Sequence, residues 1–332
     1  MSFVALDIGT SFIKGAILDT RARAVRHVRR VPFPAPVAGL PPAHVEIDPR
    51  AVTAAVEQLM GELAPLADAC QGVLLCGQMG GIILIDAEGL PRTNYISWRD
   101  QRVLEPCTAG GTNAAGRTTW LDRVAGLISP NRLAELGNEL RPGSCTALLH
   151  WLAHCRPDVT SRAIPVSLPA FVAGHLTGKI PAEDPTIAIG GLDVRTGQWH
   201  RQALAALGID GFEWPVVDAH RAAIGRVHVG GAQVPCFPAV GDHQCALLGV
   251  GLEVDELSIN VSTGSQVSRL AQQSRPGPYQ ERHYFDGCLV QTITHLPAGR
   301  SLDALVALLT ELPRAQGLTC PDPWSYIAEK AV

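Results

Sequence analysis

Several features are missing from this 332-residue sequence, and each absence excludes a class of protein. The nine cysteines include no Cys-x-x-Cys pair and their number is odd, which argues against a disulfide framework and a zinc cluster. No stripe of Lys and Arg is interleaved with aromatic residues, so nucleic acid is not an expected partner. No apolar run is long enough to cross a bilayer, and the N-terminus has no cationic leader. We therefore expect a cytoplasmic protein without a membrane partner.

The composition that is present suits a folded protein with sizeable cores. Hydrophobic residues make up 46% of the chain, charged residues 17%, and the formal net charge is −4. These proportions are typical of compact proteins rather than disordered ones. A chain of this length can form two domains. We place the first domain at residues 1–232 and the second at residues 233–332.

The order of expected elements indicates an α/β fold with a mixed sheet. Apolar strands are expected up to Ile8, from Phe12 to Leu18 and at residues 24–31. Asp48 can cap a helix whose first turn contains Pro49, and the apolar spacing carries this helix to about Leu63. Strands at 257–261 and 266–270 flank a polar turn. They repeat the strand–turn–strand pattern of the N-terminus, as two related domains facing each other across a cleft would.

The turn between the first two strands, Asp7-Ile-Gly-Thr-Ser11, carries groups suited to a phosphate. Gly9 lets the backbone bend closely, so that amides and hydroxyls around Thr10 and Ser11 can face an anion. Asp7, at the end of a buried strand, is placed to organise Mg²⁺ or its waters, and Lys14 adds a point charge for a phosphate. The turn resembles the first phosphate-binding hairpin of the actin-like superfamily. The alternative interpretation is an ordinary hairpin with a polar turn.

Seven segments together extend the resemblance to one family. The chain is similar to the FGGY carbohydrate kinases, above all to their sedoheptulokinase and xylulokinase branches, in Asp7-Ile-Gly-Thr-Ser11, Val45-Glu-Ile-Asp-Pro49, Gly77-Gln-Met79, Ile96-Ser-Trp-Arg-Asp-Gln-Arg102, Leu192-Asp-Val-Arg-Thr-Gly-Gln-Trp199, Gly241-Asp-His-Gln244 and Asn260-Val-Ser-Thr-Gly-Ser-Gln266. The resemblance implies an actin-like ATPase (ribonuclease H-like) fold, with two domains around a cleft. It also implies a phosphotransferase that uses ATP and Mg²⁺ to phosphorylate a terminal hydroxyl of a ketose or polyol.

The same resemblance assigns roles at the expected site. Asp242 matches the catalytic base of the family, which accepts the proton of the sugar hydroxyl. The alternative for Asp242 is a turn residue that follows Gly241. The nucleotide phosphates are expected to contact two hairpins, through Thr10, Ser11, Lys14, Thr263, Gly264 and Ser265.

Sugar binding is expected to use Asp242 together with Gln78, Met79, Trp98, Asp100 and His243. A polyol needs a few polar partners and an apolar wall for its C–H face. Met79 and Trp98 can equally be core residues, and His243 can be a solvent-facing turn residue. Gly80 stands where xylulokinase-like members carry a histidine, which predicts a larger pocket.

The chain is also shorter than members of that family. We expect the C-terminal part of the second domain, with its glycine-rich adenosine motif, to be missing, which would leave an unpaired sheet and exposed apolar surface. A second copy of the chain or a different partner chain can complete the domain. Sedoheptulose is the first candidate substrate, and xylulose, ribulose and glycerol are alternatives. The rival hypothesis is a truncated, non-catalytic fragment that binds a sugar or a partner.

Overall fold

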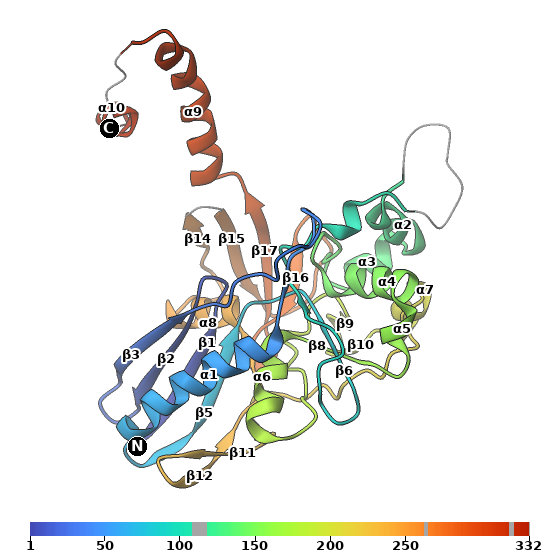
Figure 1. The fold of residues 1–332 in the computed structure, drawn as a ribbon, viewed down its shortest axis with the longest axis vertical. Coiled ribbons are helices and arrows are strands. Elements are labelled where there is room, and N and C mark those ends of the chain that lie inside the picture. Colours follow the sequence, from blue (N-terminus) through green and yellow to red (C-terminus); the bar gives the residue numbers. More distant parts are fainter. Residues whose placement is uncertain (108–117, 262–264, 319–321, 332) are drawn as a thin grey trace.

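A seven-stranded mixed sheet forms the centre of the larger part of the molecule (Figure 1). The computed structural model describes residues 1–107, 118–261, 265–318 and 322–331. The strand order is β11-β12-β5-β1-β2-β3, and β13 also lies beside β5. β1, β2 and β3 are antiparallel neighbours, whereas β5 runs parallel to β1, β12 and β13. The bounds are β1 Ser2–Ile8, β2 Phe12–Asp19, β3 Ala24–Pro32, β5 Cys70–Gly77, β11 Gly225–Val229, β12 Ala232–Cys236 and β13 Val240–Gly241.

One face of this sheet is covered by two helices, α1 (Pro49–Leu63) and α6 (Leu168–Thr177). The predicted start of α1 is confirmed, because the Asp48 carboxylate accepts a hydrogen bond from the Arg50 amide at 2.9 Å and Pro49 opens the first turn. The apolar residues of α1 at helical spacing are buried against alternating residues of β1 and β2. This packing fixes the sheet whose strand ends carry the expected phosphate turn.

A second apolar cluster lies beside the sheet, where α2, α4 and α7 pack together with residues from three short strand pairs. The helices are α2 Trp120–Leu127, α3 Pro130–Glu135, α4 Cys145–Cys155, α5 Pro157–Thr160 and α7 Arg201–Ala206. The short strands are β4 Glu46–Ile47 with β7 Tyr95–Ile96, β6 Ile83–Ile85 with β8 Ile164–Val166, and β9 Leu192–Asp193 with β10 Gln198–Trp199. Single 3₁₀ turns occur at Ala64–Leu66, Arg102–Leu104 and Phe285–Gly287.

A smaller, antiparallel sheet contains β14 (Ser258–Val261), β15 (Ser265–Ala271), β17 (Leu289–Leu296) and β16 (Gln280–His283), in that order. The helix α8 (Asp242–Gly249) follows β13 directly and contacts both sheets. Residues 233–241 were expected in the second domain, yet β12 and β13 pair with β5 in the first sheet. The smaller sheet therefore follows α8, which stands at the junction.

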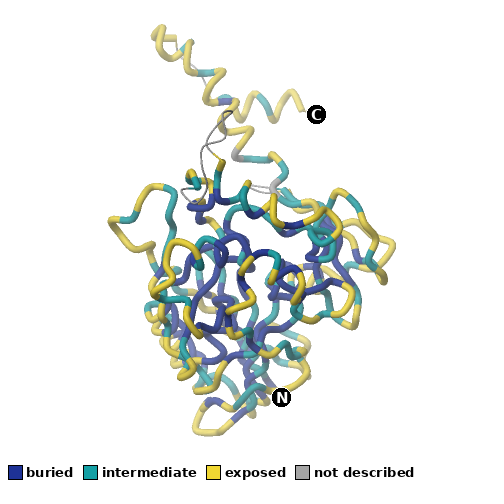
Figure 2. The backbone as a smooth tube through the Cα atoms, turned by 90° about the vertical axis from the view of Figure 1, so that its right-hand side faces the viewer, coloured by how far each residue is buried: buried dark blue, intermediate teal, exposed yellow. Residues whose placement is uncertain are grey.

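The last two helices, α9 (Gly299–Ala315) and α10 (Pro323–Lys330), extend away from the rest of the molecule in both views (Figures 1 and 2). α9 exposes apolar side chains, each at least half accessible: Leu305, Leu308, Leu309 and Leu312. In the edge strand β14, Ile259 and Val261 are similarly exposed. Exposed apolar surface on the second sheet and α9 matches the expectation from the sequence.

Candidate active site

Two carboxylates meet where the parallel strands of the first sheet end. Asp7 is the register partner of Cys76 on β5, and Cys76 is in turn the partner of Val240 on β13. Asp242, two residues beyond Val240, is the first residue of α8. The carboxyl ends of parallel strands are the usual place for ligands in open α/β sheets. The sheet thus brings together two acidic residues that are more than two hundred positions apart in the sequence.

The surroundings of Asp242 suit a proton acceptor. Burial, with a smaller contribution from the charge of Asp7, raises the pKa of the Asp242 carboxyl to about 6. The amide of His243 opposes this shift by donating a hydrogen bond of 2.7 Å to Asp242 Oδ1. Asp242 is therefore ionised at neutral pH and still binds a proton more readily than an ordinary aspartate.

Asp7 already has a cation beside it. Lys14 lies opposite Asp7 across the β1–β2 pair, and its Nζ donates to Asp7 Oδ2 at 3.1 Å. Both side chains are partly exposed, so a ligand can reach them. Among the described residues no group of three acidic, His or Cys side chains is arranged to hold a metal ion by itself. Two carboxylates are enough for Mg²⁺, which commonly takes one or two of them and completes its shell with water and substrate phosphates. Asp7 and Asp242 therefore fit this ion.

The expected sugar-binding residues after β5 form the floor of this region. The Gln78 side chain is buried; its Nε2 donates to Gly9 O at 3.4 Å, and its Oε1 accepts from the Tyr95 hydroxyl at 3.4 Å. Met79 is 8% exposed and lies against Gly241, where an added Cβ would come within 2.9 Å of Met79 Sδ. Both residues thus connect the phosphate turn to the strand that precedes Asp242.

The structure gives a local reason for a glycine at position 80, and the larger pocket expected there stays a prediction. Its φ of +83° is a conformation that favours glycine. An added Cβ would meet Trp98 Cβ at 3.2 Å and Gly143 O at 3.3 Å. Glycine is therefore favoured at this position both by its backbone conformation and by the close approach of Trp98 and Gly143. Trp98 is partly exposed and its Nε1 donates to Thr10 Oγ1 at 3.3 Å, which places it beside the phosphate turn.

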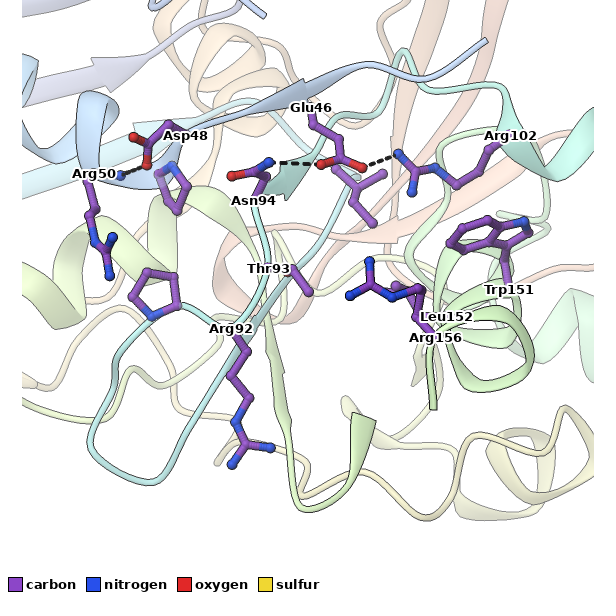
Figure 3. Close-up of a pocket in the computed structure, with 13 residues that line it drawn as sticks. Glu46, Asp48, Arg50, Arg92, Thr93, Asn94, Arg102, Trp151, Leu152 and Arg156 are labelled. Atoms are coloured by element: carbon purple, nitrogen blue, oxygen red, sulfur yellow. Dashed lines mark hydrogen bonds and ion pairs between the residues drawn. The ribbon is translucent and has the colours of Figure 1, made fainter. Parts of the chain in front are cut away.

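Asp100 is not brought to this region. Its side chain is fully buried and its oxygens accept hydrogen bonds of 2.7 to 2.9 Å from the Val45 amide and from Arg102. Arg102 also donates to Glu46 at 2.7 Å and stacks on Trp151. Figure 3 shows Arg102 and Glu46 at a separate hollow of about 280 Å³, which none of the expected site residues lines. Asp100 thus holds a loop through an ion pair.

His243 is buried as well, so it is not a solvent-facing turn residue. Its Nδ1 accepts from Arg282 at 3.3 Å, which leaves the proton on Nε2 to be donated to Ser268 Oγ at 3.1 Å. Arg282 Nε in turn donates to Glu139 Oε1 at 2.5 Å. Burial and the charge of Arg282 lower the pKa of His243 to about 4, which keeps the ring neutral. No sequence motif pointed to Glu139 or Arg282.

The second hairpin that is expected to contact phosphate, formed by β14 and β15, is described only in part. Ser265 opens β15 and is partly exposed, whereas Thr263 and Gly264 lie outside the described residues. In the first hairpin Thr10 is partly buried and Ser11 is exposed. The described members of both hairpins therefore remain reachable by a ligand.

Comparison with known proteins identifies a family and individual relatives that match most of this chain. Residues 2–249 match the family model described as FGGY family of carbohydrate kinases, N-terminal domain. A xylulose kinase of Staphylococcus xylosus is 26% identical over 92% of this chain, and that of Escherichia coli is 23% identical over 87%. The alignments cover 64% and 58% of these two relatives, so the chain spans about three fifths of their length.

Solved structures show the same fold. The xylulose kinase from Rhodospirillum rubrum superimposes with a TM-score of 0.78 at 18% identity, covering 95% of this chain and 66% of that chain. The Plasmodium falciparum glycerol kinase with ADP gives 0.77 at 16% identity, covering 99% and 66%. The expected actin-like α/β fold is thereby confirmed. No helix in the described part of the chain has the length and apolar character needed to cross a membrane.

Proposed function

The chain belongs to the FGGY family of carbohydrate kinases, and we propose that it transfers the γ-phosphoryl group of ATP to a terminal hydroxyl of a ketose or polyol. The observation that carries this proposal is that Asp7 on β1 and Asp242 directly after β13 lie at the same end of the sheet, where both strands run parallel to β5 between them. Phosphoryl transfer needs positioning, charge neutralisation and a base for the hydroxyl proton. Asp242 can supply the base, and Asp7 can hold the Mg²⁺ that neutralises charge on the phosphates.

Asp242 is the proposed base. The carboxylate accepts the proton of the sugar hydroxyl as that oxygen attacks phosphorus. Its pKa of about 6 lies close enough to neutrality for both accepting and releasing the proton. The helix that Asp242 opens is held at its second residue by the hydrogen bonds of His243, so the carboxylate has a fixed place. His243 in this proposal orients α8 and does not contact the sugar.

Asp7 is the proposed ligand of Mg²⁺. Asp242 lies close enough for the charge of Asp7 to raise its pKa, so a bound Mg²⁺ would also act on Asp242. The ion, when bound with ATP, neutralises charge on the phosphate oxygens. Lys14 exchanges its ion pair with Asp7 for a phosphate oxygen. The remaining phosphate contacts in the proposal come from backbone amides and hydroxyls of both hairpins: Thr10, Ser11, Thr263, Gly264 and Ser265.

The proposed sugar site adjoins the same strand ends. Trp98 offers an apolar face, while Gln78 and Met79 shape the floor beneath it. Sedoheptulose is the first candidate substrate, and xylulose, ribulose and glycerol follow. The names of the relatives favour small polyols and ketoses, since xylulose and glycerol kinases are among them. Asp100 is left out of this set because its ion pair with Arg102 buries it.

The test is sugar-dependent release of ADP by the purified chain with Mg²⁺, measured against these four compounds. We expect turnover with one of them, and a loss of roughly 10²- to 10⁴-fold in Asp242→Asn, the usual contribution of a general base. Circular dichroism of the variant checks that it is folded. Turnover that survives unchanged in Asp242→Asn would refute the assigned base. A folded chain that is silent with every sugar would refute kinase activity for this chain and favour a binding role.

A further inference from the structure

A stripe of leucines along α9 is left uncovered by the rest of the described chain. In this helix, Gly299–Ala315, leucines recur three and four positions apart, the spacing that places side chains on one helix face. Their exposed fractions lie between 42% and 67%. The leucine stripe consists of Leu302, Leu305, Leu308, Leu309 and Leu312. It is exposed even though α10 follows α9 and is present in the structure.

The opposite face of α9 is polar. It carries Asp303, Glu311 and Arg314, and the exposed Ala307 lies among them. A helix with one charged face and one apolar face is stabilised mainly by covering the apolar face. A contiguous apolar patch bordered by polar residues marks an interaction site on a protein surface. The leucine stripe therefore indicates a docking surface.

The spacing of the stripe favours another helix as its partner. Steps of three and four residues alternate along Leu302, Leu305, Leu309 and Leu312, which is the spacing of two helices that pack side by side along a shared seam. In such a seam each leucine inserts between side chains of the facing helix. The α9 helix of a second copy presents the matching leucines, because a two-fold axis brings the same patch of both subunits together.

The position of α9 leaves room for that second copy. In both views α9 extends away from the two sheets, so a second helix can lie along it without meeting the body of the molecule (Figures 1 and 2). The 17 residues of α9 make it about 25 Å long. An antiparallel pair places the two bodies at opposite ends of this length and opposes the two helix dipoles favourably. A parallel pair would bring both bodies to the same end.

We propose that two copies of this chain associate through their leucine stripes, with the two α9 helices antiparallel across a two-fold axis. Each leucine side chain has roughly 100 Å² of apolar surface, so the exposed fractions leave about 600 Å² to be buried in the pair. Apolar atoms make up about 65% of homodimer interfaces, which gives a total interface of about 900 Å². Stable interfaces bury about 1,200–2,000 Å². The association is therefore reversible, with a dissociation constant in the micromolar range.

Sedimentation equilibrium of the whole chain tests the association without requiring any turnover. Between about 1 and 100 µM we expect the average mass to rise from 35.2 kDa toward twice that value. Leu309→Glu, near the middle of the stripe, should raise the dissociation constant about a hundredfold or more, because the dimer loses two leucines and gains two like charges. Ala307→Glu, the same new residue on the opposite face, should leave the dissociation constant unchanged. Both positions are exposed, so circular dichroism should show that both variants are folded.

A mixture of two oppositely charged variants tests whether α9 meets α9. Leu309→Lys should be monomeric like Leu309→Glu, whereas an equimolar mixture of the two should recover the dimer, since opposite charges then face each other across the two-fold axis. A parent chain that stays monomeric at about 100 µM would overturn the proposal and leave the stripe to a different polypeptide. Association that survives Leu309→Glu, is lost equally in Ala307→Glu, or is not recovered in the mixture would also overturn it. None of these results depends on the proposed kinase activity.

Discussion

The buried pair of Glu139 and Arg282 offers the sharpest test of how β16 of the smaller sheet is held against the segment between α3 and α4. Their side chains are 1% and 5% exposed, and Arg282 Nε lies 2.5 Å from Glu139 Oε1. Glu139 Oε2 also lies 3.5 Å from the guanidinium of Arg141, so one carboxylate faces two cations. Burial and the charge of Arg282 lower the pKa of Arg141, which shows how closely the cations are placed. Glu139 is therefore the member of this cluster whose charge is needed most.

The magnitude follows from burial. Removing one partner of a buried ion pair typically destabilises a protein by about 3–5 kcal/mol, because a buried charge is left uncompensated. Glu139→Gln should reach this range, since two guanidinium groups then face a neutral amide. Arg282→Met should have a smaller effect, because Glu139 keeps Arg141 beside it. The double variant should be more stable than the two single effects summed, with a coupling of about 2 kcal/mol.

Urea unfolding followed by circular dichroism measures these differences. The matched control is Glu213→Gln, which breaks the Arg162–Glu213 pair, whose side chains are 85% and 46% exposed at 3.2 Å. Exposed pairs contribute about 0–1 kcal/mol. If Glu139→Gln unfolds no more easily than Glu213→Gln, then the buried pair does not hold β16 against the α3–α4 segment, and the fixed place of His243 loses its support.

Three further predictions concern Asp242 and Asp100. The folded pKa of Asp242, about 6, lies above its usual 3.8, so the stability it contributes is complete below about pH 4 and is lost as the pH rises through 6. At about pH 8, Asp242→Asn should therefore be more stable than the parent, by at most about 3 kcal/mol, and its urea midpoint should be higher. At about pH 4 the two proteins should have the same midpoint. Equal midpoints at both pH values would contradict the raised pKa of Asp242. The turnover of the parent should fall on acidification with a midpoint near 6, not near the value of about 4 for His243, and a profile flat to pH 5 would exclude Asp242 as base. Asp100→Asn should lower stability by about 3 kcal/mol or more without changing the KM for the sugar, whereas a stable variant with a raised KM would return Asp100 to the site.

The elements with local signals were predictable from the sequence. Asp48 and Pro49 mark the start of α1, and alternation of apolar residues marks β1 and β2, because caps and periodicity depend only on neighbours in the chain. The paired strands β1–β2 and β14–β15 were predictable for the same reason, because their apolar residues are local signals in the sequence. Which strands become neighbours was not encoded locally, so the pairing of β12 and β13 with β5 became visible only in the fold.

Asp100 shows how a motif can mislead about a residue's task. The segment that contains it resembles a sugar-binding motif, yet Arg102 two positions later captures both carboxylate oxygens. Asp193 and Arg195 form the same arrangement, with the Arg195 amide and Nε on Asp193 Oδ1 and its terminal nitrogen on Oδ2. The same Asp-x-Arg spacing occurs at Asp19 and Asp48, where the carboxylate accepts from that Arg only through its backbone amide. The spacing alone therefore does not predict the ion pair, which was visible only in the fold.

The partners of His243 carried no such signal, because Glu139, Ser268 and Arg282 come from three separate segments. When only the neighbours in sequence are known, a histidine next to the proposed base fits a ligand-binding position and a core position equally well. Burial decides the question here. Burial keeps the ring neutral, and the hydrogen bonds with Arg282 and Ser268 assign its proton to Nε2. The His243 side chain thus holds α8 in place.

The first turn of α8 is held by hydrogen bonds to two separate parts of the chain, which fix the position of the proposed base Asp242. The Gly241 amide, at the end of β13, donates to Thr186 Oγ1 at 3.1 Å, and that hydroxyl, on a segment outside both sheets, donates to the buried Asp184 at 2.6 Å. Gln244 donates 3.0 Å hydrogen bonds to the carbonyl of Thr186 on one side and to that of His283, on β16, on the other. Hydrogen bonds therefore tie the first turn of α8 both to the segment around Thr186 and to β16, so we expect a displacement of either to move Asp242, the proposed base.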